Sequence, residues 1–176
     1  MRTIVAPDQL AELDDWLARR QRSNADLYDH EIGGTYYMAP APGVPHAAQQ
    51  ARLIVVLTPL AAALGWAVLG PTNLGRLGQE DRNYVVPDVV VSTRLAGAAL
   101  LDAVVAIEIL SPHEDEDVKV AAYRAVVAAT GLKLCELWYV DPSEHTLTIR
   151  NDRFEQVDRS DVFSLTIDEL QALFDL

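Results

Sequence analysis

The most informative segment of the sequence is VVAIEILSP, residues 104–112. Apolar side chains fill both the odd and the even positions before Leu110, apart from one acid. Such a run is typical of a strand that is covered on both faces. The acid is Glu108, and an ionised carboxylate inside a sheet is costly unless it is paired or bound to a metal. The run therefore predicts a central strand that carries one paired or functional carboxylate.

A second acid stands at the start of a second apolar run, VPDVVV at residues 86–91. The β-branched residues after Asp88 predict another core strand. Lys119 follows on a helix that we expect to begin at Asp115 or Asp117. Two strand carboxylates and a lysine are the minimum set for metal-assisted cleavage of a phosphodiester.

The composition is that of an ordinary folded chain with an unusual charge. The 176 residues, half of them apolar, predict one α/β domain over residues 1–176. The net charge of −12 repels polyanions, which argues against tight, non-specific binding of nucleic acid. An acidic site can still recruit divalent cations, so a nuclease is not excluded.

Several local features bear on the location of the protein. The N-terminus does not resemble a signal peptide, and Pro59 and Gly65 interrupt the uncharged segment 53–70. We therefore expect a soluble, cytoplasmic protein that does not span a membrane. The single cysteine, Cys135, cannot form an internal disulfide, and its apolar neighbours predict that its side chain is buried.

The remaining pattern predicts a mixed central sheet flanked by helices. Expected helices are residues 8–22, 46–64, 115–129 and 167–174, and expected strands are residues 26–32, 35–38, 66–69, 88–92, 104–110, 134–140, 146–150 and 154–157. The dipeptide Gly33-Gly34 is typical of a hairpin turn, so the strands that flank it should be antiparallel. The strand–helix–strand unit over residues 104–140 should be parallel and right-handed.

Several motifs follow one another in a recognisable order: Gly34 before YYMAP, His46 at a helix start, VPD at 86–88, EILSP at 108–112, Lys119 four residues before Tyr123, and LWYVDP at 137–142. In this order they resemble the bacterial Uma-two family of the PD-(D/E)XK restriction-endonuclease-like superfamily. The resemblance spans nearly the whole chain. It implies a restriction-endonuclease-like fold with a mixed central sheet flanked by helices.

The resemblance also implies roles for individual residues. It makes Asp88 and Glu108 the metal-binding carboxylates, and Asp88, Glu108 and Lys119 the catalytic set. Leu110 occupies the place of the superfamily's usual lysine, and Lys119 from the following helix is implied to substitute for it. Asp115, four residues before Lys119, matches a further acid of the family.

Supporting positions are less sharply defined by the motifs. His30 occupies the place of a glutamate common in the first hairpin of the family, so either Asp29 or Glu31 serves instead or this extra ligand is missing. His46 is interpreted either as a group beside the site or as a helix cap only. Tyr123 shares a helix face with Lys119, so it either braces that lysine or packs in the core.

The implied function is an Mg²⁺- or Mn²⁺-dependent endonuclease that hydrolyses DNA phosphodiester bonds. Because the charge of −12 provides little grip on DNA, we expect a homodimer or help from another factor. One alternative is a catalytically weak or inactive nuclease fold that acts as an interaction module. In that case Glu108 would form a buried ion pair with Lys119 or an arginine, and Asp88 would cap backbone amides. A third reading is a metal-dependent hydrolase of a small phosphorylated substrate.

Overall fold

The computed structural model describes residues 44–75, 83–93, 102–111 and 116–176, together with the backbone of residues 3–5, 28–32 and 35–38. The helix expected over residues 8–22, the Gly33-Gly34 turn and Asp115 lie outside the described residues.

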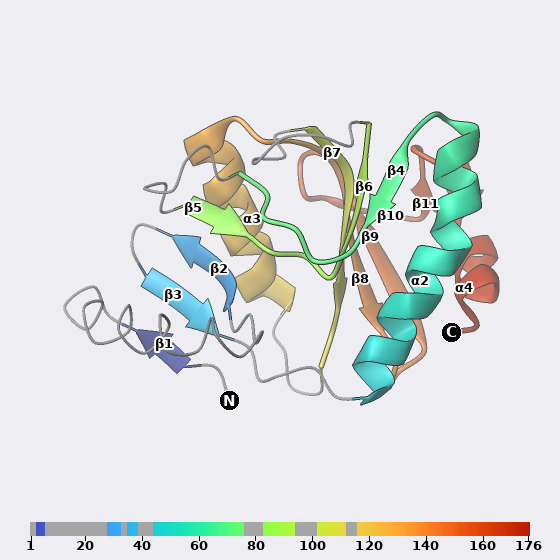
Figure 1. Ribbon diagram of the computed structural model, residues 1–176, viewed down its shortest axis with the longest axis horizontal. Helices are drawn as coiled ribbons and strands as arrows, with labels where there is room; N and C mark the ends of the chain where they lie inside the picture. Colours follow the sequence, from blue (N-terminus) through green and yellow to red (C-terminus); the bar gives the residue numbers. More distant parts are fainter. Residues whose placement is uncertain are drawn as a thin grey trace.

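A six-stranded sheet in the order β10-β9-β8-β7-β6-β4 forms the centre of the structure (Figure 1). Its strands are β4 (Ala67–Leu69), β6 (Val89–Ser92), β7 (Asp102–Ile109), β8 (Lys133–Asp141), β9 (Thr146–Arg150) and β10 (Gln156–Val157). The strands β7 and β8 are parallel and are connected through α3 (Glu116–Thr130), whereas the other neighbouring pairs are antiparallel. The expected mixed sheet and the parallel pairing across residues 104–140 are confirmed.

Helices cover both faces of this sheet (Figure 1). The helices α2 (Val44–Ala63) and α4 (Ile167–Phe174) contribute to the core on one face, and α3 contributes to the core on the other. At the end of β7, Ile107 belongs to the core under α2 and α4, and Ala106 belongs to the core under α3. Because side chains alternate along a strand, Glu108 faces α3.

A second sheet lies beside α3. Its order is β1-β3-β2-β5, with β1 (Thr3–Val5), β2 (Tyr28–Ile32), β3 (Thr35–Met38) and β5 (Asn83–Val85). The helix α3 contacts β2, β5 and β8, and so lies between the two sheets. A Cβ atom at Gly75 would stand 2.5 Å from Cγ1 of Val126, and its φ is +90°. Only glycine allows the segment before β5 to approach α3 this closely.

A two-stranded ribbon of β11 (Arg159–Ser160) and β12 (Leu165–Thr166) precedes the last helix. The Thr166 side chain accepts a hydrogen bond from the backbone N–H of Glu169, and the Glu169 carboxylate accepts one from the backbone N–H of Thr166. This capping box satisfies two backbone donors that a helix start leaves open. The helix expected at residues 167–174, with Thr166 as its cap, is confirmed.

The prediction that Cys135 is buried is wrong: its side chain is exposed. Lys133 and Cys135 are exposed whereas Leu134 and Glu136 are buried, so the exposed positions share one face at the start of β8. The apolar neighbours of Cys135 in the sequence could not reveal which face of this strand stays exposed. In the described part of the chain, none of the helices has the length and apolarity that a membrane crossing requires.

Candidate active site

Glu108 lies near the end of β7 and is held by two side chains of α3. Lys119 Nζ donates to Glu108 Oε2, and Tyr123 Oη donates to Glu108 Oε1 at 2.7 Å. The relative exposures of Glu108, Lys119 and Tyr123 are only 4%, 4% and 1%. Because Lys119 and Tyr123 are one turn apart, α3 presents both to the same point of the strand. The buried charge of Glu108 is thus matched by a cation and a hydroxyl donor.

Asp88 stands directly before β6, the strand next to β7. Val89 pairs with Ile107 in the antiparallel register, so one further step along both strands places Asp88 opposite Glu108. Residues directly opposite in an antiparallel pair point to the same face. Asp88 Oδ2 also accepts a hydrogen bond of 2.8 Å from the backbone N–H of Ile109. The two acids therefore lie at one end of one strand pair.

The first turns of α2 hold Asp88 at two points. His46 Nε2 lies 3.2 Å from Asp88 Oδ2, and Gln50 Nε2 donates to the backbone oxygen of Asp88 at 2.7 Å. The hydrogen bond to Asp88 raises the pKa of His46 above its usual value, although burial and the positive charge of Lys119 oppose this shift. The Asp88 carboxylate therefore stabilises the charged form of His46.

Electrostatic effects connect the two acids. Burial raises the pKa of Tyr123 most, and the negative charges of Glu108 and Asp88 raise it further. Tyr139, which pairs with Glu108 in the β7–β8 register, also has a raised pKa because of burial first and Glu108 second. Its hydroxyl is buried and has no hydrogen-bond partner among the described residues. Glu108, Lys119 and the two tyrosines are therefore grouped in a poorly solvated region, with the partly exposed Asp88 at its edge.

The donor set suits a hard cation such as Mg²⁺ or Mn²⁺, which prefer oxygen ligands. Among the described residues, no hydrogen bond reaches Oδ1 of Asp88, and each carboxylate oxygen of Glu108 has more than one lone pair. The described ranges contain no group of three or more His, Cys, Asp and Glu side chains arranged around one metal position. Mg²⁺ usually binds one or two carboxylates and keeps several waters. The residue types at Asp88 and Glu108 therefore fit a two-carboxylate site.

The structure brings together five of the residues that the sequence singles out: Asp88, Glu108, Lys119, His46 and Tyr123. The hydrogen bond from Tyr123 fixes the orientation of the Glu108 carboxylate. Asp115 is outside the described residues, and Glu31 is described only by its backbone, which pairs in β2 with Tyr84 of β5.

Two residues near the site were missed by the sequence reasoning. Gln50 could have been found, because it stands four residues after His46 and therefore shares its helix face. Tyr139 stands in the motif LWYVDP, which by itself gives no sign of a place near Glu108. Its position opposite Glu108 depends on the parallel register of β7 and β8, which the sequence does not specify to one residue.

A cavity of about 340 Å³ adjoins the site. It is lined by Pro45 and His46 at the start of α2, residues 109–111 after Glu108, and residues 142–143 after β8. His46 belongs both to this cavity and to the contact with Asp88.

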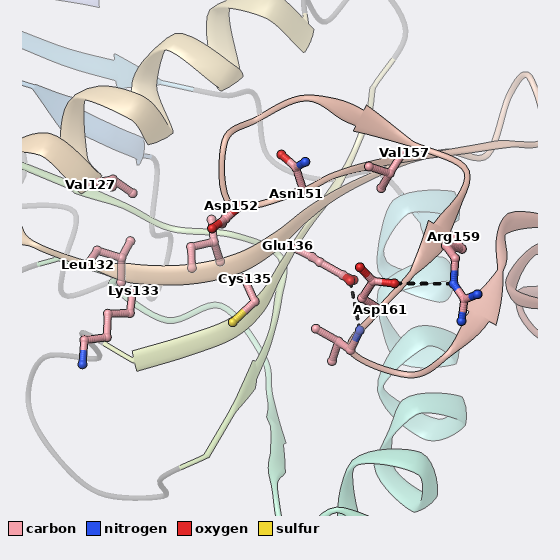
Figure 2. Close-up of a pocket in the computed structure, with 12 residues that line it drawn as sticks. Val127, Leu132, Lys133, Cys135, Glu136, Asn151, Asp152, Val157, Arg159 and Asp161 are labelled. Atoms are coloured by element: carbon pink, nitrogen blue, oxygen red, sulfur yellow. Dashed lines mark hydrogen bonds and ion pairs between the residues drawn. The ribbon is translucent and has the colours of Figure 1, made fainter.

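A larger groove of about 560 Å³ lies at the other end of β8, and Cys135 and Glu136 line it (Figure 2). Glu136 accepts hydrogen bonds from Trp138 Nε1 at 2.8 Å, Ser160 Oγ at 2.8 Å and the backbone N–H of Val162 at 3.1 Å. All three donors are neutral. Figure 2 shows this carboxylate directed toward the segment that contains Arg159 and Asp161.

Comparisons with known proteins agree with this architecture. Residues 10–169 match the family model described as "Uma2: Putative restriction endonuclease". The fold is similar to the crystal structure of "a putative nuclease belonging to DUF820" from Anabaena variabilis ATCC 29413, with a TM-score of 0.66 and 18% sequence identity. The match covers 92% of this chain and 98% of that chain, and it confirms the expected fold class. A search of curated proteins gave no match.

Proposed function

This chain belongs to the Uma2 family of putative restriction endonucleases, and we propose that it is a metal-dependent endonuclease that hydrolyses DNA phosphodiester bonds. The observation that carries the proposal is the buried contact of Glu108 with Lys119, beside a second carboxylate on the adjacent strand. Asp88, Glu108 and Lys119 form the proposed catalytic set, and Asp88 and Glu108 are the proposed metal ligands.

Each residue of the set has a distinct task in this proposal. Bound Mg²⁺ or Mn²⁺ would neutralise charge on the scissile phosphate and lower the pKa of the attacking water. Lys119 stabilises the negative charge that develops on the phosphate oxygens, and it is effective because it is buried and already oriented. Tyr123 fixes the Glu108 carboxylate, while His46 and Gln50 fix Asp88.

One observation favours a second candidate function, an inactive interaction module. Both oxygens of Glu108 already accept hydrogen bonds, from Lys119 and from Tyr123, as in a purely structural ion pair. A structural pair needs no cation, so the two candidates differ in whether the protein binds a divalent metal at Asp88 and Glu108.

The proposal includes a homodimer, because a chain with a net charge of −12 has little long-range attraction for DNA and a second copy doubles the contacts. Analytical ultracentrifugation at the assay concentration measures this. A fully active monomer would remove the dimer from the proposal and leave the chemistry intact.

The experiment that tests the function is cleavage of labelled DNA, single-stranded and duplex, by the purified chain in Mg²⁺, Mn²⁺ or EDTA. We expect cleavage with either ion, none in EDTA, and none from Asp88→Asn. Asp102→Asn is the matched control, because Asp102 is a partly exposed acid at the opposite end of β7. Cleavage that persists in EDTA or in Asp88→Asn would contradict the proposal.

A further inference from the structure

The cavity beside the site is positioned to hold a part of the substrate. Leu110 and Ser111 directly follow the strand end that bears Glu108, and His46 contacts Asp88 from the cavity wall. A phosphate placed between Asp88 and Glu108 would therefore have its attached nucleoside within reach of this cavity.

The lining of the cavity suits a flat and largely apolar group. Pro45, Leu110 and Pro142 provide apolar surface, and His46 provides an aromatic ring. Ser111 and Ser143 add hydroxyl groups. A cavity of about 340 Å³ falls at the small end of the range for ligand pockets, which combine apolar walls with a few polar groups. It can take one base, whereas a stacked base pair in a duplex cannot enter it.

The net charge of the protein also favours binding of an unpaired base. Non-specific DNA binding normally comes from cationic contacts to phosphates, and a chain with a net charge of −12 is poorly equipped for this. Uncharged contacts can add the affinity that a basic surface would otherwise provide. Burying the face of an unpaired base is such a contact, and it operates on any base because each has an apolar face.

Resting on the proposed function, we propose that this cavity binds one unpaired nucleobase next to the scissile phosphate, so that the enzyme acts on single-stranded or locally unpaired DNA. His46 contributes a stacking face, and Leu110 and the two prolines enclose the base. The groove at the other end of β8 does not serve this purpose, because it lies beside Glu136, several residues along the strand from the position opposite Glu108.

The inference is tested by binding in Ca²⁺, with single-stranded oligonucleotides that carry 2-aminopurine or an abasic residue at one position. Leu110→Trp fills the cavity, and Ser143→Trp obstructs it from an exposed position that tolerates bulk if the first variant folds poorly. Cys135→Trp is the matched control, since it places the same bulk in the other groove.

We expect 2-aminopurine fluorescence to rise when the wild type or Cys135→Trp binds the oligonucleotide. Loss of base contact should weaken binding by about tenfold, whether it is caused by Leu110→Trp, by Ser143→Trp or by the abasic residue. The cavity variants should lose no further affinity on the abasic strand, because both changes remove one contact. Equal affinity of the wild type for the abasic and normal strands would overturn the inference.

Cleavage in Mg²⁺ separates this inference from the proposed function. Single-stranded DNA and a duplex with a mismatch should be cleaved, and a fully paired duplex should be cleaved much more slowly. Equal cleavage of the paired duplex would overturn the base pocket while the nuclease function stands. If no substrate is cleaved but the cavity variants still abolish the 2-aminopurine signal, the base pocket stands and the proposed function fails.

Discussion

Glu108 and Glu136 are two buried carboxylates on adjacent parallel strands, each with a relative exposure of 4%. They differ in the charge of the groups that bind them. Glu136 is bound by an indole, a hydroxyl and a backbone amide, which are neutral. Glu108 is bound by a lysine and a tyrosine, and Asp88 and His46 lie at the same strand end. Burial of an acid is therefore a weak sign of function, and the nature of its partners is the better one.

The hydrogen-bond donors explain why Glu108, and not Glu136, is the proposed catalytic acid. The hydrogen bonds from Ser160 and Val162 to Glu136 connect β8 to the segment around Ser160, so their role is to stabilise the fold. Lys119 and Glu108 carry opposite charges. A metal ion can replace Lys119 as the partner of Glu108, and a phosphate can replace Glu108 as the partner of Lys119. The proposed difference between a structural carboxylate, Glu136, and a catalytic one, Glu108, can be tested by changing the two residues in parallel.

The largest expected effect is on catalysis. Glu108→Gln should lower the rate of metal-dependent cleavage by about a thousandfold or more, since it removes a proposed metal ligand and such a cation supplies several kcal/mol of transition-state stabilisation. Glu136→Gln should leave the single-turnover rate unchanged at a temperature where both variants are folded. A similar loss of rate in both variants would erase the distinction between the two acids.

The next effect is on stability without metal. Lys119→Met should destabilise the protein by about 3–5 kcal/mol, because it leaves Glu108 buried without its cation. Urea unfolding in EDTA measures this free energy. The double variant Glu108→Gln with Lys119→Met should recover much of the loss, because it removes the uncompensated charge. If the single variant costs under about 1 kcal/mol, the pair is not the buried, coupled contact described above.

Metal binding should distinguish Glu108 from Glu136 through a smaller change in the free energy of unfolding. Mn²⁺ at a hundred times its dissociation constant should stabilise the wild type by about 2.7 kcal/mol. The melting temperature should rise less in Glu108→Gln and as much as in the wild type in Glu136→Gln. Absence of any rise at millimolar Mn²⁺ or Mg²⁺ would favour the interaction module over the nuclease.

The smallest effect concerns the structural acid. Ser160→Ala removes one of the three donors to Glu136 and should cost about 2 kcal/mol, as expected for a hydrogen bond to a charged group. Thermal or urea unfolding gives the value, and the Mn²⁺-induced shift in melting temperature is the control and should not change. If Ser160→Ala altered the Mn²⁺-induced shift, Glu136 would be coupled to the proposed metal site.

Much of the fold could be predicted because its signals are local. The strand at residues 146–150 and the helix at residues 167–174 were predicted with the boundaries that the structure has. Alternating polarity predicts the first, and the cap at Thr166 predicts the start of the second. The exposure of Cys135 is not local, because it depends on which face of β8 the rest of the fold covers.

The candidate site was only partly predictable for the same reason. Glu108 was singled out as an acid inside an apolar run, yet Glu136 stands in a similar run, LCELWYV, and was not noticed. The sequence signal is nearly equal at the two positions. What separates them is the set of contacts from α3 and from the segment around Ser160, and these contacts depend on tertiary packing.

The most direct test of the central claim is a crystal of the wild-type protein soaked in Mn²⁺ and measured at the manganese absorption edge. We expect one anomalous peak between Asp88 and Glu108, at about 2.0–2.6 Å from an oxygen of each carboxylate. This peak should be lost in Glu108→Gln and kept in Glu136→Gln. A wild-type crystal with no peak between Asp88 and Glu108, or with its peak at Glu136, would contradict the proposed metal site.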